Sequence, residues 1–321
     1  MNISSTAPET VSLGNNGPQI TPLGVGTWSW GDRLFWDYGK EYDQTQVQAA
    51  FQASVEAGIT LFDTAEVYGI GESERLLGNF AQTSDREIAI ATKYFPLPWR
   101  IFPQSVKEAV SNSLERLQIE SIPLYQVHTP FSFLMSQETL MKALAEEVKQ
   151  GRIQAVGVSN YSATQMREAQ EHLQKQGIPL VSNQLPYSLL NRKIESNGTF
   201  QTAQELGVKI IAYSPLAQGL LTGKYTGEEK PTGARGLDPK FKSSGVNKIS
   251  PVIDTLKQLA DKYQKTPAQV ALNWLITQGT IPIPGAKNAN QAQQNAGALG
   301  WQLNTEDAQT LTQVSEPWLT S

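Results

Sequence analysis

ITLFDTAEVYG, residues 59–69, is the stretch from which fold and chemistry can be read together. Its apolar, β-branched first half ends in Asp63, and Tyr68 follows one short turn later. Two further runs end in the same way, because EIAIATK (87–93) ends in Lys93 and IPLYQVH (122–128) ends in His128. Active sites of α/β barrels are built from side chains at the C-terminal ends of successive strands. These four residues therefore predict one site at one end of a barrel.

Strand-like and helix-like segments alternate along the rest of the chain, which predicts a parallel sheet covered by helices. Eight such units close into a (β/α)8 TIM barrel, an α/β fold whose usual size is about 250 residues. We therefore expect a single barrel domain over residues 1–321. The expected strands are LGVGT (23–27), ITLFD (59–63), EIAIATK (87–93), IPLYQVH (122–128), RIQAVGVS (152–159), PLVSNQ (179–184), VKIIAYS (208–214) and TIPIPG (280–285).

Two segments lie outside the eight units. VSLGNNGPQI (11–20) is typical of a β-hairpin with NNG at its turn, and it is placed to cover the bottom of the barrel. A long loop from about Gln218 to Asn247 shows no clear periodicity, and loops of this length are usually functional or disordered. Because it follows the seventh strand, we expect it on the catalytic face.

Composition excludes several classes of protein. A net charge of −4 without a dense basic cluster argues against a general nucleic-acid binder, whose affinity comes from neutralising phosphates. The absence of cysteine excludes thiolate chemistry, and two histidines without HExxH spacing argue against a zinc site, so we expect no metal. The N-terminus lacks the basic start and apolar stretch of a signal peptide, and no run approaches the ~20 apolar residues of a membrane helix. We expect a soluble, cytoplasmic protein that makes no contact with a membrane and whose oligomeric state stays open.

Asp63, Tyr68, Lys93 and His128 together suit acid chemistry on a carbonyl group. A tyrosine with an ordinary pKa near ~10 is a slow acid at neutral pH, and a nearby ammonium in a dehydrated cleft lowers that pKa. Lys93 is the candidate cation, and Asp63 would hold it charged and in place. His128 would orient the carbonyl oxygen by a hydrogen bond and share in proton delivery, while Tyr68 gives the proton.

Each residue taken alone also has a structural interpretation. An aspartate that ends a strand is often a helix cap, and a tyrosine is more often a packed aromatic than an acid. Lysines are mostly solvated. A dinucleotide fold of the doubly wound type is not indicated, because GVGTW and GIGESE both lack the third glycine of GxGxxG.

The motifs taken together resemble the aldo-keto reductase superfamily over almost the whole chain. The matching stretches are DTAEVYG with GESERLLG, ATK, LYQVH, GRIQAVGVSN, NQLPYSLLNR, AYSPLAQGLLTGKY and IPIPGAKNANQAQQNAGAL. The resemblance implies an oxidoreductase that reduces an aldehyde or ketone to an alcohol, with hydride from NADPH bound across the barrel mouth. It also implies that Asp63, Tyr68, Lys93 and His128 are catalytic.

The resemblance further implies where the NADPH/NADP+ cofactor lies. Ser159, Asn160 and Gln184 would grip the nicotinamide carboxamide, although serine and asparagine also favour turns. Tyr213 would stack on the nicotinamide, and Lys287, just before a helix start, would meet the 2′-phosphate. Gln294 stands where the family more often has glutamate. The remaining expected contacts are Gly26, Thr27, Trp28, Ser214, Leu216, Gln218, Gly219, Lys224, Arg235, Gly285, Gln291 and Asn295.

Aromatic residues crowd the loops after the first and third expected strands and indicate a flat, aromatic-lined pocket. Trp28, Trp30 and Trp99 are the candidate substrate contacts. GTWSWGDRLFWDYG, PWR and GALGWQL resemble the plant-type pyridoxal reductase branch, which suggests pyridoxal as the small-molecule carbonyl substrate. Two alternatives stay open: an NADPH-binding regulatory protein that resembles potassium-channel β subunits, and a different barrel enzyme such as a phosphate-binding isomerase or lyase.

Overall fold

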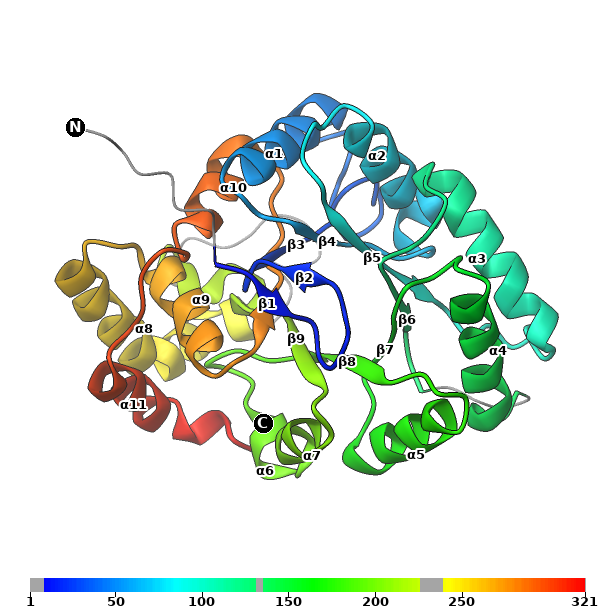
Figure 1. The fold of residues 1–321 in the computed structure, drawn as a ribbon. Helices are drawn as coiled ribbons and strands as arrows, with labels where there is room; N and C mark the ends of the chain where they lie inside the picture. The colour runs from blue at the N-terminus through cyan, green and yellow to red at the C-terminus, as the bar shows by residue number, and fades with distance from the viewer. Residues whose placement is uncertain (1–8, 131–134, 226–238, 321) are drawn as a thin grey trace.

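Eight parallel strands form the centre of the molecule in the computed structural model, which describes residues 9–130, 135–225 and 239–320. The strands follow one another around the sheet in the order of the chain, from β3 to β10 (Figure 1). A parallel bridge between Gly26 and Gly285 joins the two ends of the sheet and closes the barrel. The strands are β3 (Gly24–Gly26), β4 (Leu61–Asp63), β5 (Ala89–Tyr94), β6 (Leu124–Val127), β7 (Val156–Ser159), β8 (Leu180–Pro186), β9 (Lys209–Tyr213) and β10 (Ile281–Pro282).

Helices surround the strands on the outside of the barrel (Figure 1), so the predicted (β/α)8 TIM barrel is confirmed. Their bounds are α1 (Gln44–Glu56), α2 (Glu72–Ala81), α3 (Pro103–Leu117), α4 (Gln137–Lys149), α5 (Ala163–Gln174), α6 (Lys193–Ser196), α7 (Thr199–Leu206), α8 (Ser243–Tyr263), α9 (Pro267–Thr277), α10 (Ala289–Ala296) and α11 (Thr305–Val314). Every helix in these described ranges is too short or too polar to cross a lipid bilayer.

Capping residues in the sequence determine where several helices begin. Asp43 accepts hydrogen bonds from the first backbone amides of α1, and the Gln46 side chain accepts one back from the Asp43 amide. Ser162 and Gln165 form the same reciprocal pair at α5. Each pair satisfies amides that would otherwise lack a partner, which stabilises the helix start.

The predicted N-terminal hairpin is present as β1 (Val11–Ser12) and β2 (Gln19–Ile20), which pair antiparallel. Leu13 and Ile20 are fully buried against apolar side chains from the first residues of the barrel strands, such as Leu61 and Leu124. The hairpin lies across one end of the barrel in Figure 1 and therefore covers its N-terminal end.

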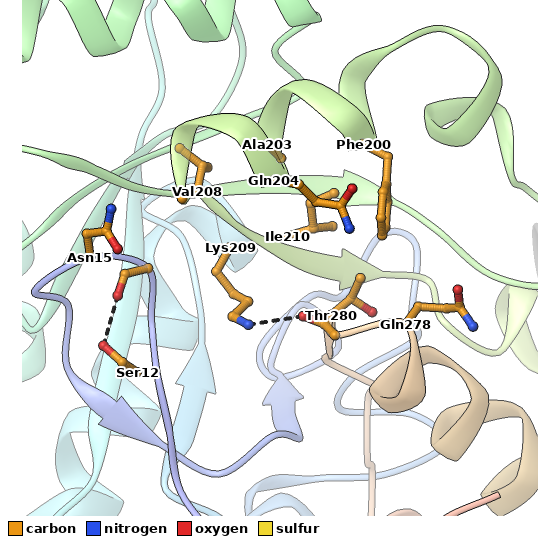
Figure 2. A pocket seen from close by; sticks show the side chains of 13 residues that line it. Ser12, Asn15, Phe200, Ala203, Gln204, Val208, Lys209, Ile210, Gln278 and Thr280 are labelled. Atoms are coloured by element: carbon orange, nitrogen blue, oxygen red, sulfur yellow. Dashed lines mark hydrogen bonds between the residues drawn. The ribbon is translucent and has the colours of Figure 1, made fainter. Parts of the chain in front are cut away.

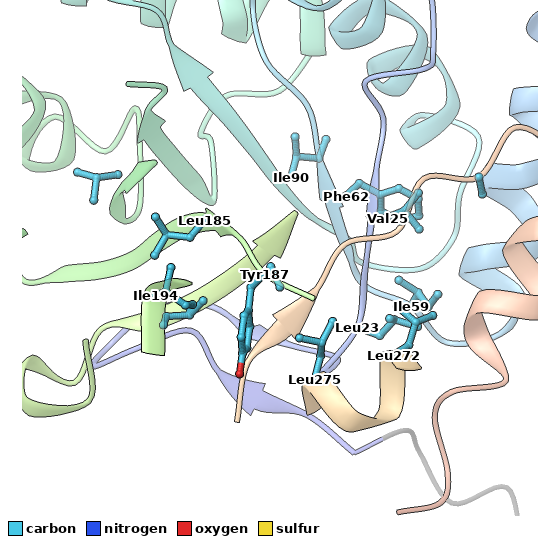
Figure 3. Packing of buried hydrophobic residues seen from close by; sticks show 14 of the residues in the cluster. Leu23, Val25, Ile59, Phe62, Ile90, Leu185, Tyr187, Ile194, Leu272 and Leu275 are labelled. Atoms are coloured by element: carbon cyan, nitrogen blue, oxygen red, sulfur yellow. The ribbon is translucent and has the colours of Figure 1, made fainter. Parts of the chain in front are cut away.

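The main apolar core lies between the strands and the helices. In Figure 3 Phe62 of β4 and Ile90 of β5 point into this layer, together with Leu272 and Leu275 of α9. Side chains alternate between the two faces of a strand, so the residues next to Phe62 and Ile90 point into the barrel instead. This alternation is what delivers polar side chains to the barrel interior.

The segment after β9 is more ordered than the predicted long loop. A 3-10 helix, η2 (Ala217–Thr222), follows β9, and a second one, η4 (Pro239–Phe241), precedes α8, which already begins at Ser243. The predicted long loop after the seventh barrel strand is present, but its predicted end at Asn247 is wrong because α8 begins at Ser243. Its middle, residues 226–238 with Arg235, lies outside the described residues.

Candidate active site

The alternation of β4, β5 and β6 brings three of the four predicted catalytic residues together. Leu61 at the start of β4 and Ala91 in β5 belong to the apolar cluster inside the barrel. Asp63 and Lys93, each two residues further along the same strand, therefore also point inward, above that cluster. His128 follows β6 directly, and its backbone amide donates to the Tyr94 carbonyl at 2.9 Å.

Lys93 is the centre of the site and is fully buried. Its Nζ donates to Asp63 Oδ1 at 2.5 Å, to the Thr64 carbonyl at 2.7 Å and to the Tyr68 hydroxyl at 3.3 Å. These three bonds use all three donors of an ammonium group. Tyr68 begins the short η1 helix (Tyr68–Gly71), so the turn after β4 brings the phenol back over the lysine.

The second carboxylate oxygen of Asp63 is held by two amide side chains. Gln126 Nε2 donates to Oδ2 at 3.1 Å and Gln184 Nε2 donates to it at 2.7 Å. Gln184 was predicted to grip the nicotinamide, and in the structure its side-chain amide nitrogen donates to the Asp63 carboxylate. Gln126 was not among the predicted site residues, although its place two residues before His128 in LYQVH gives both side chains the same register on the strand.

The pKa values differ from the predicted pattern at Tyr68. Burial raises the pKa of the Tyr68 phenol, and the positive charge of Lys93 offsets this only in part, so the pKa lies above the usual 10. Lys93 thus acts on Tyr68 in the predicted direction, but the prediction that the Tyr68 pKa falls below 10 is wrong in this structure. Burial also acts to lower the pKa of the Lys93 ammonium, but the charges and hydrogen bonds of Asp63 and Tyr68 outweigh it and the pKa is raised.

His128 lies beside Tyr68 as an uncharged imidazole. Its ring meets the Tyr68 ring edge-on, with centroids 5.7 Å apart, and meets Phe95 in the same way at 5.4 Å. Burial, aided by the positive charge of Lys93, lowers the pKa of His128 to about 3. A neutral imidazole offers one N–H for a hydrogen bond but is not an acid near pH 7. The predicted orienting role fits this state, whereas proton delivery from an imidazolium does not.

Polar residues of β7 and β9 meet beside the catalytic group. The Tyr213 hydroxyl donates to Asn160 Oδ1 at 3.0 Å, and Asn160 Nδ2 donates to the His128 carbonyl at 3.1 Å. Ser159 Oγ donates to the Gln184 carbonyl at 3.0 Å. Asn160 thus links the Tyr213 hydroxyl to the backbone of His128, and Ser159 links the end of β7 to β8.

Several predicted cofactor contacts lie in the turn after β9, where the backbone conformation is strained. Ser214 and Gln218 have φ values of 51° and 57°, in the left-handed region that non-glycine residues rarely adopt. Leu216 and Gly219 lie in the same turn, where the Gly219 amide donates to the Leu216 carbonyl at 2.9 Å. Lys224 is exposed, with its ammonium over the Tyr225 ring.

Further predicted cofactor contacts lie after β10, at the edge where the Gly26–Gly285 bridge closes the barrel. Lys287 precedes α10, and its Nζ donates to the Trp36 carbonyl at 3.2 Å and lies 4.2 Å from the centre of the Tyr42 ring. Its backbone amide donates to Gln291 Oε1. Asn295 Nδ2 donates to the Gly285 carbonyl, and the Gln294 side chain is exposed.

Gly26 ends the first barrel strand, and Thr27 follows it directly. A Cβ atom at Gly26 would lie 2.9 Å from the Ile283 carbonyl oxygen, so the strand closure requires glycine there. Thr27 is fully buried, and its hydroxyl donates to the Asp63 carbonyl at 2.9 Å. The Thr27 side chain thus holds the strands together below the mouth.

The three tryptophans predicted to touch substrate differ in position. Trp28 is 39% exposed and stacks near Tyr68, with ring centroids 6.1 Å apart, while Trp99 is 71% exposed on the loop after β5. Trp30 is fully buried, donates its indole N–H to the Ala286 carbonyl and packs on Phe62. The expectation for Trp30 is therefore corrected: its ring belongs to the core and has no exposed surface for a substrate.

A cavity of about 390 Å³ lies at the opposite end of the barrel from these residues. Lys209 begins β9 and lines this cavity, whereas Tyr213, which bonds to Asn160 in the candidate site, ends the same strand. Figure 2 shows Lys209 Nζ directed to the edge of the cavity, where it donates to the Gly279 carbonyl at 3.2 Å. The cavity takes no part in the site described above.

Known proteins resemble this chain over nearly its whole length. The aldo/keto reductase family profile matches residues 22–316. The chain is 40% identical over 300 residues to the chloroplastic pyridoxal reductase of Arabidopsis thaliana, covering 90% of this chain and 81% of the relative. It is 30% identical over 329 residues to the NADH-specific methylglyoxal reductase of Escherichia coli, covering 95% and 98%. Among solved structures, a glycerol dehydrogenase from Gluconobacter oxydans matches with a TM-score of 0.83 and 26% identity over 98% of each chain. The resemblance indicated by the sequence motifs is confirmed.

Proposed function

This chain belongs to the aldo/keto reductase family, and we propose that it reduces the aldehyde of pyridoxal, or of a similar aromatic aldehyde, with NADPH. The observation that carries the proposal is the buried group in which Lys93 links Asp63 to the Tyr68 hydroxyl, beside a neutral His128. This group has the parts needed to protonate a carbonyl oxygen. The family assignment supports an oxidoreductase acting on carbonyl groups.

We propose that Tyr68 donates the proton. The phenol gives its proton to the carbonyl oxygen as negative charge builds there, and the Lys93 ammonium stabilises the phenolate that remains. The raised pKa of Tyr68 keeps the phenol protonated at neutral pH, and the forming alkoxide is a far stronger base than a phenolate. The neutral His128 donates a hydrogen bond that orients the same oxygen. When bound, a nicotinamide cofactor supplies the hydride.

The donor set at the closing edge of the barrel fits a cofactor that carries a 2′-phosphate. Lys287 places a cation directly before the N-terminus of α10, where backbone amides favour anions. At the other end, Ser159, Asn160 and Tyr213 offer hydroxyl and amide groups of the kind that hold a carboxamide. These features support NADPH as the cofactor, although one relative is named as NADH-specific.

Pyridoxal is the proposed substrate because of the relative at 40% identity and because of the aromatic rings at the mouth. Trp28 lies beside Tyr68 with part of its surface exposed, and Trp99 is exposed on the neighbouring loop. Flat rings of this kind can pack against a planar pyridine.

The test is a cofactor-oxidation screen with NADPH and NADH in parallel. Pyridoxal, nitrobenzaldehyde, butanal and methylglyoxal are compared by kcat/KM. We expect NADPH to be preferred and pyridoxal to be the best of the four. If pyridoxal were the poorest, the substrate proposal would fall and a general aldehyde reductase would remain; absence of turnover with every aldehyde would remove the proposed function.

A further inference from the structure

Gln126 lies inside the barrel, in the same layer as the charged pair of the candidate site. Leu124, two residues earlier on β6, belongs to the apolar cluster inside the barrel, and the alternation of a strand therefore turns the Gln126 side chain inward as well. Gln126 is the register partner of Lys93 between β6 and β5. Its side chain is fully buried, although glutamine is found mostly on protein surfaces. The barrel thus places a side-chain amide next to the Asp63–Lys93 pair.

The Gln126 amide is hydrogen-bonded at one end only. Its Nε2 donates to Asp63 Oδ2 at 3.1 Å. Its Oε1 is buried and, within the ranges that the structure describes, accepts no hydrogen bond. An amide turned the other way would direct Oε1 to the carboxylate, where both oxygens are acceptors, so Asp63 determines its orientation. Because an unpaired buried acceptor costs free energy, the amide is an expensive way to fill this space. That cost points to a role of the amide at Asp63.

The neighbouring strand β7 leaves room for the Gln126 side chain at Gly157. Gly157 is opposite Gln126 in the register of β6 and β7. A Cβ atom at Gly157 would lie 2.9 Å from Gln126 Cγ and even closer to Ser182 Oγ of β8. Any larger residue at 157 would therefore displace the side chain that reaches Asp63. The packing of the strands holds Gln126 in this place.

Asp63 connects Gln126 to the proposed acid. Asp63 Oδ1 accepts from Lys93 at 2.5 Å, while Oδ2 accepts from the two glutamine amides. With both oxygens bonded, the carboxylate cannot turn without breaking one of these bonds. Lys93 in turn donates to the Tyr68 hydroxyl at 3.3 Å, a long contact that a small shift of the ammonium would break. The place of the ammonium beside the phenol therefore depends on how firmly Asp63 is held.

Gln126 is the more enclosed of the two amides on Asp63 Oδ2. Gln184 is also a proposed contact of the nicotinamide, whereas Gln126 is fully buried and can hold Asp63 in the same way with and without cofactor. We propose that Gln126 is a positioning residue: by holding Asp63 from inside the barrel, it keeps the Lys93 ammonium in place beside the Tyr68 hydroxyl. This inference rests on the proposed carbonyl reduction and adds to it a residue that touches neither substrate nor cofactor.

Gln126→Leu removes the donor and the unpaired oxygen together. At saturating NADPH and nitrobenzaldehyde, kcat should fall about tenfold to a hundredfold, the scale of loss when a reacting group is slightly misplaced. KM for the aldehyde and Kd for NADPH should change by less than about threefold, because the variant does not alter a binding contact. The midpoint of urea unfolding should stay near that of the wild type, because removal of the unpaired oxygen offsets the lost bond to Asp63.

The matched control is Gln170→Leu on α5. Gln170 is also a buried glutamine, and its Oε1 accepts the Leu180 backbone amide at 2.8 Å, away from the candidate site. Its loss leaves a buried amide unpaired, so the urea midpoint should fall while kcat stays unchanged. The two leucine variants should thus show opposite patterns, which a general loosening of the barrel would not produce.

Gln126→Glu adds a pH readout. When protonated, the new carboxyl can donate to Asp63 Oδ2 as the amide does; when ionised, it repels Asp63. The charged groups beside it are Asp63 on β4 and Lys93 on β5, while β7 and β8 contribute Gly157 and Ser182, which do not ionise. Burial and the charge of Asp63 favour the protonated form. The ratio of variant to wild-type kcat should therefore be highest near about pH 5 and decrease toward about pH 8, as the carboxyl ionises.

A measurement on the resting protein separates this inference from the proposed function. Tyrosine isotopically labelled at Cζ gives an NMR signal that depends on the hydrogen bonds of the hydroxyl, and Tyr68→Phe identifies the signal of Tyr68. Gln126→Leu should move this signal and Gln170→Leu should not. The inference is overturned if Gln126→Leu keeps the wild-type kcat, if it leaves the Tyr68 signal in place, or if its loss of kcat comes with a lowered urea midpoint. If the wild type reduces no aldehyde, the proposed function fails, and the Tyr68 signal alone decides whether Gln126 positions Lys93.

Discussion

The two halves of the barrel mouth hold their polar groups in different ways. One half, called the catalytic arc after its proposed role, consists of the ends of β4, β5 and β6 with Asp63, Tyr68, Lys93 and His128. Its charges are buried and are joined by hydrogen bonds between neighbouring strands. The other half, the proposed binding arc, consists of the segments after β7, β9 and β10. Its polar groups lie on turns, and Asn160, Ser214, Ala217 and Gln218 adopt left-handed backbone conformations there.

The difference shows how one barrel can combine fixed chemistry with ligand binding. Lys93 already uses its three donors, so the catalytic arc is arranged before any ligand binds. Left-handed non-glycine residues cost free energy, and such strain clusters where ligands are held. We therefore expect changes in the catalytic arc to affect turnover and stability, and changes in the binding arc to affect cofactor affinity.

Tyr68→Phe should give the largest effect. Loss of the proposed proton donor should lower kcat by about 10²–10⁴, the usual contribution of a general acid. NADPH affinity should change little, because the expected cofactor contacts lie in the other arc. Steady-state kinetics and a fluorescence titration of NADPH measure the two quantities. A parallel loss of cofactor affinity would remove the distinction between the arcs at this residue.

Asp63→Asn should cost stability because it leaves a buried ammonium without its counter-ion. Removal of one partner of a buried ion pair typically lowers the free energy of unfolding by about 3–5 kcal/mol. Glu72→Gln is the control, since the Glu72–Arg75 pair is largely exposed and should cost less than about 1 kcal/mol. Urea unfolding compares the two variants. Equal losses would mean that the Asp63–Lys93 pair is no more important than a surface pair.

Lys287→Ala should act on the binding arc alone. Loss of a charged hydrogen bond to the 2′-phosphate should weaken NADPH binding about tenfold to a hundredfold and leave NADH binding nearly unchanged. Lys265→Ala is a suitable control, because Lys265 also places its ammonium over an aromatic ring, that of Trp301, at a position outside both arcs. If both cofactors were weakened alike by Lys287→Ala, the 2′-phosphate would be recognised by other groups.

The positions of the catalytic-arc residues could be predicted from the sequence, because the periodicity of the strands determines which side chains reach the barrel mouth. In ITLFD and EIAIATK, two-residue alternation and position at the strand end together place Asp63 and Lys93 inside the barrel mouth. Trp30 shows where this reasoning fails. It lies two residues from Trp28 in an aromatic loop, and local sequence does not reveal that its indole reaches the Ala286 carbonyl, a contact between segments far apart in the chain.

The electrostatics were harder to predict than the positions. The effect of Lys93 on Tyr68 has the predicted sign, but burial opposes it and prevails, and the extent of burial depends on the packed structure. The ion pair between Glu66 and Arg100 joins two loops, so neither residue alone indicates it. The start of α8 at Ser243 was missed because SSGVNKIS lacks a strong helical pattern.

His128 allows a pH test of the catalytic arc. Its pKa of about 3 lies below the usual 6.5, so between these values the unfolded chain binds a proton that the folded protein does not. This contribution makes stability fall as the pH decreases below 6.5, by at most about 1.4 kcal/mol per pH unit, and it is absent above 6.5. His128→Asn should remove that contribution. The measurement is the difference in unfolding free energy between wild type and variant at pH 7 and pH 5; a difference that does not change with pH would mean that His128 is not held neutral.

Ser214→Gly should produce the smallest effect, with opposite signs in two measurements. Ser214 has a φ of 51°, and glycine adopts this conformation without the penalty of about 1–2 kcal/mol that a side chain incurs. Glycine also loses more conformational freedom on folding, by about 0.5–1 kcal/mol, so stability should rise by about 0.5–1 kcal/mol. Cofactor affinity should fall, because a hydroxyl expected to contact the cofactor is lost. The matched control is Gln264→Gly, since Gln264 has a φ of 54° at the C-terminal cap of α8, outside the mouth. Urea unfolding should give both variants a similar gain, and only Ser214→Gly should weaken NADPH binding. If Gln264→Gly weakened the cofactor equally, strain in the proposed binding arc would have no special connection with the ligand.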